Sequence, residues 1–175
     1  MVLIAKKKVF EVDIPVMDQE IQVLAVNQDA LIGRIIKLDL TRVLKGKNLD
    51  ASIIIKKEND KLIGEFISIK LLPYFIRKMI RKSTSYVEDS FSTKTKDGEI
   101  VIKPYMLTRK RVHRSVRKAL RDEARKVITG FVSNRDNREI FFSILTGSMQ
   151  KEIASGLRKI YPLALCEIRM AKLKI

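Results

Sequence analysis

One stretch of this chain combines residue types and a spacing that suit the binding of a polyanion. Residues 109–126 hold nine Lys or Arg and only two acids, so they contribute +7 to a formal net charge of +16. Cations recur at helical steps along one side of the stretch, at Arg114, Arg117, Lys118, Arg121 and Arg125. Such a row matches a partner whose negative charges are regularly spaced, and nucleic acid is the commonest partner of that kind.

The sign of these charges separates the stretch from an ordinary solvated helix. Solvated helices usually interleave both signs, because acid–base pairs four residues apart are favourable and like-charge pairs are not. The face here is nearly one-signed, which favours a nucleic acid partner over the alternative of a plain basic surface.

A second segment of one charge sign lies at residues 71–82, where apolar residues follow helical spacing and cations crowd the other side. Contact with RNA is one interpretation of this segment, and a solvated face is the other. Together the two segments give the predicted nucleic-acid-binding residues: Arg77, Lys78, Arg81, Lys82, Arg109, Lys110, Arg111, Arg114, Arg117, Lys118, Arg121 and Arg125.

Residues suited to catalysis are few. The lone His113 lies in the basic stretch, where a phosphate or surface contact is expected rather than general-base work. Asp89 follows Glu88 as a possible acidic pair, Asp136 stands alone in a loop, and Cys166 is expected in the core. The sequence has no Walker loop, no GxGxxG after a strand, no HExxH and no GxSxG. We therefore predict no enzyme, no catalytic residue, no cofactor and no metal.

Base stacking is predicted to be a minor part of any RNA contact. The four tyrosines are too scattered in the sequence to form a stacking platform, and no RRM or KH signature is present. Phosphate contacts, which position a protein on structured RNA without reading its sequence, are predicted to dominate.

The composition excludes several classes of protein. Apolar residues at 46% are enough for a core, and a pI of about 10.1 favours polyanionic partners. A single Cys rules out an internal disulfide and fits a reducing compartment. No segment approaches the length of a membrane span, and the apolar start of the chain is too short for a signal peptide. The expected location is cytoplasmic, with no membrane partner.

Hydrophobic periodicity predicts strands at 8–14, 20–25, 31–40, 51–57, 62–70, 84–95, 99–106 and 163–175. Helices are predicted at 71–82, from Arg109 through the basic stretch, after the break at 133–137, and from Ser148 to Ile160. The apolar face of the basic helix is assigned to Val112, Val116, Ala119, Leu120, Ala124, Val127, Ile128 and Phe131.

These elements predict an α+β fold. Its antiparallel, partly barrel-like sheet has about six to eight strands and about three to four helices, and the C-terminal strand returns to the sheet. We expect one compact domain with two lobes. Residues 1–106 form a β-rich lobe with one basic helix, and residues 107–175 form a helical lobe with the main basic helix and the last strand.

Several short motifs occur one after another along the chain. They are Leu31-Ile32-Gly33-Arg34, residues 93–98 (TKTKDG), residues 116–120 (VRKAL), and residues 159–163 (KIYPL) followed by Glu167-Ile168-Arg169. In this order and spacing, from about Lys8 to Leu173, the chain resembles the archaeal and eukaryotic small-ribosomal-subunit proteins of the S-three-A-e (or S-one-e) family.

The resemblance implies a structural constituent of the small ribosomal subunit. It implies binding to rRNA on the platform near the messenger exit, with neighbouring platform ribosomal proteins and messenger RNA as further partners, in the cytoplasm. Arg117 and Lys118 match basic positions of the family's helix, and Arg81 and Lys82 match another basic run. The family has no known catalytic residues.

Two departures from the family pattern affect this expectation. The usual longer basic N-terminal tail with Trp is not found ahead of the first predicted strand. Leu72-Pro73-Tyr74 stands where Thr-Arg is common, so the contact of that Arg comes from Arg77 or is lost. The alternative functions are an RNA-processing enzyme that uses Asp89, Asp136 or His113, and a non-ribosomal nucleic-acid-binding protein such as a DNA packer.

Overall fold

The computed structural model describes residues 7–44, 47–58 and 61–174. Alternating apolar and polar residues build nine strands in these ranges: β1 (Lys8–Ile14), β2 (Gln19–Ala25), β3 (Ile35–Asp39), β4 (Leu49–Glu58), β5 (Lys61–Leu71), β6 (Tyr86–Glu88), β7 (Phe91–Lys94), β8 (Glu99–Thr108) and β9 (Leu163–Leu173). A single turn of 3-10 helix, η1 (Asp29–Leu31), precedes β3.

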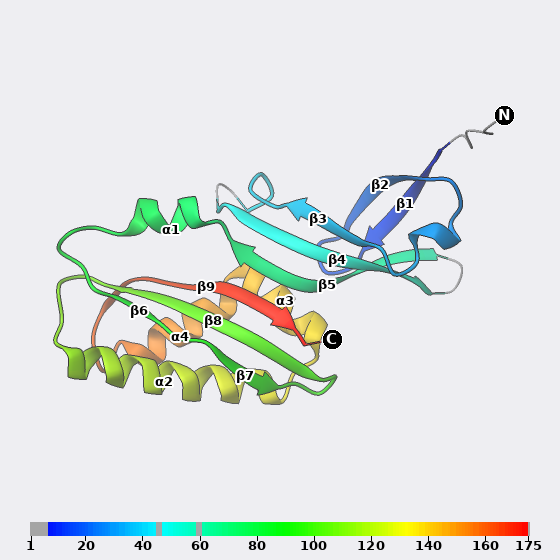
Figure 1. Ribbon diagram of the computed structural model, residues 1–175. Coiled ribbons are helices and arrows are strands. Elements are labelled where there is room, and N and C mark those ends of the chain that lie inside the picture. Colours follow the sequence, from blue (N-terminus) through cyan, green and yellow to red (C-terminus); the bar gives the residue numbers. More distant parts are fainter. Residues whose placement is uncertain (1–6, 45–46, 59–60, 175) are drawn as a thin grey trace.

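One sheet contains all nine strands, in the order β2–β1–β5–β9–β8–β6, with β4 also on β5, β3 on β4 and β7 also on β8. All pairs are antiparallel except the short parallel contact of β1 with β5, and the sheet of the described residues does not close into a barrel. The fold class predicted from the sequence is confirmed, with nine strands in place of the six to eight expected. The C-terminal strand β9 returns between β5 and β8 (Figure 1).

Four α-helices accompany the sheet: α1 (Pro73–Met79), α2 (Arg114–Ser133), α3 (Asn137–Thr146) and α4 (Ser148–Leu157). Three of them pack together on the sheet, with α2 against β6, β7 and α4, α4 against β9, and α3 against β5. Figure 1 shows α1 on the other side of the strands, away from these three helices.

The core consists of two clusters of buried side chains. The larger one joins the apolar faces of β4, β5, β8 and β9 to α2, α3 and α4, around residues such as Ile69, Ile102 and Leu120. The smaller one, around Leu31 and Ile55, lies under the β1–β2 hairpin. The division into lobes at residue 106 stays a prediction.

Several boundaries differ from the sequence expectation. The basic helix begins at Arg114 and not at Arg109, because β8 continues to Thr108, which pairs with Leu163 of β9. The strand expected at 31–40 begins at Ile35, after Gly33 adopts a left-handed conformation with φ of 77°.

The other differences lie at ends and breaks of elements. The strand expected at 84–95 is interrupted at Asp89 and Ser90 and becomes β6 and β7. Helix α1 is shorter than the 71–82 expected, because Ile80 takes an extended conformation. The last helix ends at Leu157 rather than Ile160. The sequence Lys45-Gly46-Lys47-Asn48 predicts a basic loop, of which residues 45–46 lie outside the described residues.

No helix in the described ranges is long and apolar enough to cross a membrane.

Candidate nucleic-acid interface

The two basic segments meet because one buried threonine ties their loops together. Thr108 is fully buried, and its hydroxyl accepts a hydrogen bond of 3.0 Å from the amide of Ser85. The carbonyls of Lys110 and Ser85 lie 2.7 Å and 3.0 Å from the same hydroxyl and can accept its proton. The amide of Val112 donates to the Ser85 hydroxyl at 3.3 Å. The segment before β6 is thereby fixed to the segment before α2.

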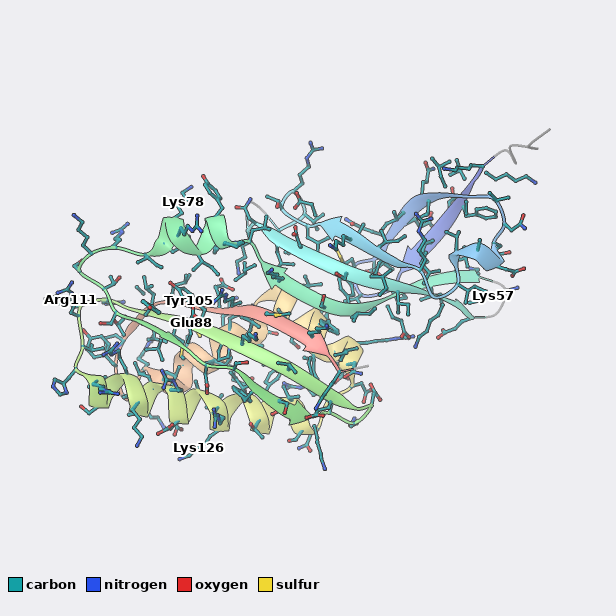
Figure 2. The ribbon with its side chains drawn as sticks, in the orientation of Figure 1. Lys57, Lys78, Glu88, Tyr105, Arg111 and Lys126 are labelled. Atoms are coloured by element: carbon teal, nitrogen blue, oxygen red, sulfur yellow. The ribbon has the colours of Figure 1, made fainter. Side chains whose placement is uncertain are left out.

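Cations from both segments line a hollow of about 320 Å³ at this junction, which we call the end hollow. Lys78 and Arg81 come from α1 and the loop after it, and Arg109 comes from the connection into α2. Apolar side chains such as Met79 and Leu107 form part of its wall. Figure 2 places Lys78 and Arg111 toward the same end of the molecule. Residues about thirty positions apart in the sequence thus form one cationic surface.

Helix α2 orients the main row of cations because its other side is buried. Leu120, Ala124 and Ile128 are fully buried, and Val116 and Val127 are half-buried against the core. This spacing of three and four residues is the apolar stripe predicted from the sequence. The assignment of Ala119 to that stripe is wrong, because its side chain is exposed beside the cations.

A second hollow, of about 570 Å³, lies on the exposed side of α2 and is called the helix hollow here. It is lined by Tyr86, Arg114, Ser115, Arg117, Lys118, Arg121 and Asp122. Four of the predicted binding residues are therefore gathered at the first half of the helix. Tyr86 of β6 lines the same hollow.

The cations of α2 differ in what they contact within the protein. In the described part of the chain, Arg114, Arg117, Lys118 and Arg121 form no ion pair with a carboxylate. The Arg121 guanidinium donates only to the backbone carbonyl of Glu88, at 3.2 Å. The first half of the helix therefore presents positive charge that the protein itself does not neutralise.

The second half of α2 is different. Arg125 donates three hydrogen bonds to the Asp89 carboxylate, one of 2.9 Å and two of 3.1 Å, and its guanidinium lies 5.3 Å from the centroid of the Phe91 ring. Lys126 lies 3.7 Å from Glu123. Arg125 thus holds the break between β6 and β7 against the helix. Its contact with nucleic acid stays a prediction.

The remaining predicted residues lie in neither hollow. Arg77 is exposed on α1, Lys82 is exposed in the loop that follows it, and Lys110 and Arg111 are exposed on the connection into α2. All four flank the end hollow in sequence.

The residues considered for catalysis do not form a constellation. Asp89 is held by Arg125, and the Glu88 carboxylate accepts from Arg169 at 2.8 Å. His113 is the residue before α2, with Nδ1 3.3 Å from the Ser115 hydroxyl, so it does not lie inside the helix as expected.

Asp136 lies beyond the other end of α2 and pairs with Lys96 at 3.2 Å. The twenty residues of α2 span about 30 Å, which separates His113 from Asp136. Among the described residues, no group of three or more His, Cys, Asp or Glu is arranged to hold a metal ion.

Cys166 is partly buried on β9, as the sequence suggested. Burial raises the pKa of its thiol to about 12, with a smaller contribution from the neighbouring Glu167 carboxylate. The thiol is therefore protonated at neutral pH and is a poor nucleophile.

Three residues of the interface were not predicted from the sequence: Tyr86, Thr108 and Asp122. Tyr86 lies outside both basic segments, so only the pairing of β6 with β8 brings it to α2. Asp122 is one of the two acids in residues 109–126, and nothing in the sequence indicates that it lines a cationic hollow. The only indication for Thr108 in the sequence is its β-branched side chain, which is common in strands.

Comparison with known proteins identifies the family. The model of the Ribosomal S3Ae family matches residues 4–174. The small ribosomal subunit protein eS1 of Saccharolobus islandicus is 32% identical over 120 residues, which are 68% of this chain and 58% of that protein. The eS1 protein of Methanothrix thermoacetophila is 27% identical over 157 residues, which are 87% of this chain and 74% of that protein.

The chain thus covers less than two thirds of the length of the Saccharolobus relatives and about three quarters of the Methanothrix one. The match to the family model nevertheless extends over almost every residue, in agreement with the resemblance seen in the sequence. The chain belongs to the Ribosomal S3Ae family.

Proposed function

We propose that this protein is a structural constituent of the small ribosomal subunit that binds rRNA through phosphate contacts. The observation that carries the proposal is the unneutralised row of cations on the first half of α2, in a chain of the Ribosomal S3Ae family. The cations of such a row repel one another in the free protein, and a polyanion bound against them offsets that repulsion. The names of the relatives support the ribosomal assignment.

The binding surface comprises both hollows and the exposed cations that flank the end hollow in sequence. A-form RNA presents its phosphates and 2′-hydroxyls rather than its major-groove base edges, so Arg and Lys side chains on a rigid helix are suitable ligands. The surface lies on the platform of the subunit near the messenger exit, with neighbouring platform proteins as further partners, and messenger RNA as a third.

The protein acts without catalysis in this proposal. Asp89, the acid offered for an RNA-processing enzyme, is held in an ion pair with Arg125, and Asp136 is paired with Lys96. Incubation of the purified protein with RNA and Mg²⁺ tests this point. RNA cleavage that disappears in Asp89→Asn would replace the structural role with an enzymatic one.

Sedimentation and footprinting test the ribosomal role. Tagged protein in a cell lysate is expected to sediment with small subunits, and chemical footprints of subunits with and without it are expected to differ in a compact region of rRNA. Protein that stays at the top of the gradient, with no change in rRNA reactivity, would contradict the proposal. Preference for duplex DNA over folded RNA would favour a DNA packer.

A further inference from the structure

The helix hollow contains one group that phosphate binding does not explain. Tyr86 is 56% exposed, although a large aromatic side chain gains most from burial. Tyr86 lines the hollow together with four cations, all of which come from α2. A ring that stays exposed beside arginines has a free face available to a flat partner.

The hollow also has a carboxylate and a hydroxyl in its lining. A site for a phosphate alone would not include a carboxylate, yet Asp122 lines the hollow together with the Ser115 hydroxyl. A nucleotide presents an aromatic base, a phosphate on each side, and donors on the base edge and at the 2′-hydroxyl. The hollow offers a partner for each of these groups, and its volume of about 570 Å³ lies within the roughly 300–1,000 Å³ of ligand sites.

Tyr86 is also held in place by its surroundings. Its backbone pairs with Leu107 of β8, and the next residue, Val87, is 1% exposed. The preceding residue, Ser85, is fixed by its hydrogen bonds to Thr108. A ring on such a backbone loses little conformational freedom when a partner stacks on it.

We propose that the helix hollow binds one unpaired nucleotide of RNA, whose base stacks on the Tyr86 ring. The phosphates on either side of this nucleotide contact Arg114, Arg117 and Arg121, and the Asp122 carboxylate accepts a hydrogen bond from the base edge or the 2′-hydroxyl. The inference rests on the proposed RNA binding and adds a preference for a bulged or looped nucleotide over a continuous duplex. Unstacked bases in loops and bulges are the usual targets of proteins that recognise RNA.

Two hairpin RNAs with the same stem test this inference. One carries a single bulged 5-iodouridine and the other lacks that nucleotide. The wild-type protein is expected to bind the bulged RNA roughly 5- to 150-fold more tightly, the range that one base–aromatic stack contributes. Near-ultraviolet light is expected to cross-link the iodouridine to the peptide that contains Tyr86.

Three variants separate stacking from charge. Tyr86→Phe keeps the ring and is expected to keep the preference, whereas Tyr86→Leu keeps apolar bulk without the ring and is expected to lose it. Tyr74→Leu is the matched control, because Tyr74 is 66% exposed on α1 and lines neither hollow. Should Tyr86→Leu fail to fold, the wild-type preference and the position of the cross-link still decide the matter.

The outcomes distinguish the inference from the function on which it rests. Equal binding of both RNAs by the wild type, or a preference that survives in Tyr86→Leu, overturns the nucleotide site and leaves phosphate binding intact. Failure of the wild type to bind either RNA overturns both proposals. A cross-link at another residue also removes Tyr86 from the site.

Discussion

Cations on one helix face are not equivalent, because the protein neutralises some of them and leaves others free. On α2 the division falls between Arg121 and Arg125. Residues before it line the helix hollow without a carboxylate partner among the described residues, whereas Arg125 and Lys126 face Asp89 and Glu123. Affinity for RNA is therefore expected to depend on the first half of the helix.

Charge reversal at Arg117 tests this expectation. Arg117→Glu is expected to weaken RNA binding at least about tenfold, because a hydrogen bond to a charged group contributes about 1.5–3 kcal/mol and the new carboxylate repels phosphate. The thermal midpoint is expected to stay the same, since the side chain is exposed. Filter binding and circular dichroism measure the two quantities.

Lys126→Glu is the matched control, with the same change of charge on the same helix. Figure 2 shows Lys126 on the side of α2 that points away from the sheet. The affinity of the Lys126→Glu variant for RNA is expected to remain within a few-fold of that of the wild type. Equal losses in the two variants would mean that total charge, and not the helix hollow, determines binding.

Spacing in the sequence predicts the faces of α2 but not this division. Helical periodicity placed Arg117 and Arg125 on one side correctly, since a step of eight residues is close to two full turns. The partner of Arg125 is Asp89, thirty-six residues earlier, and only the break between β6 and β7 brings it within reach. Pairing across such a distance leaves no periodic signal.

At the scale of elements, the interface depends on how two loops are joined. The loop before β6 and the loop before α2 make backbone and side-chain hydrogen bonds through Ser85 and Thr108. Removal of a buried hydroxyl from such a position destabilises the fold, because its buried partners are left without a hydrogen bond. The cations of the end hollow depend on this junction for their relative positions.

Thr108→Val, which keeps the side-chain shape, is expected to lower the free energy of unfolding by about 1–3 kcal/mol. It is also expected to weaken RNA binding, because Arg81 and Arg109 lose their fixed separation. Urea denaturation and filter binding are the measurements. Thr146→Val, at an exposed site at the end of α3 where the hydroxyl donates to the Phe142 carbonyl of its own helix, is expected to change stability by less than about 0.5 kcal/mol. A similar effect in both variants would remove the special role of the junction.

A second link between elements should respond to pH. Glu65 on β5 accepts from Lys56 at 2.7 Å and from Arg138 of α3 at 2.8 Å. Burial acts to raise the pKa of Glu65, but the hydrogen bonds from these two cations outweigh it and hold the pKa below the usual value of 4.5. Because the folded pKa is the lower one, the stabilisation is present above about pH 4.5 and is lost as the pH falls through the folded pKa.

Glu65→Gln is therefore expected to be less stable than the wild type at neutral pH and nearly equal to it in acid. Chemical denaturation at several pH values gives the difference in unfolding free energy. Glu139→Gln, at an exposed site on the same helix as Arg138, is the control and is expected to change the free energy of unfolding at neutral pH by less than Glu65→Gln does. A constant difference for Glu65→Gln would show that the variant acts through packing instead.

The order of elements was predictable because each is marked by its own residues. Lys96-Asp97-Gly98 lies between the strands expected at 84–95 and 99–106, and Asp-Gly at such a place is typical of a hairpin, which the register of Lys94 with Glu99 confirms. The end of β8 was not predictable, because residues 107–108 are strand by virtue of long-range pairing, with β9 more than fifty residues later and, for Leu107, also with Tyr86 of β6. For the same reason α2 begins at Arg114 and not at Arg109 as the sequence predicted.

At the scale of the whole molecule, charge is distributed unevenly. The two cationic hollows lie toward the end that carries α1 and the start of α2. A third hollow, of about 400 Å³, lies at the β1–β2 hairpin and is lined by Glu11, Asp13 and Glu20 among others. Figure 1 shows this hairpin at the opposite end of the sheet. A polyanion is therefore attracted more strongly to the cationic end than to the end with the β1–β2 hairpin, which orients the protein as it approaches.

Salt dependence of RNA binding tests this distribution. If the cationic end neutralises roughly 6–10 phosphates, affinity is expected to fall by about 10³–10⁵ between about 50 and 200 mM salt, because bound counterions are released on association. Arg117→Ala is expected to lower the slope of log affinity against log salt by about 1, as one phosphate contact is lost. Glu20→Gln, at the acidic end, should leave the slope unchanged although it too alters the net charge by one. A flat salt response in the wild type would mean that phosphates contribute little and that the cationic row on α2 exists for another reason.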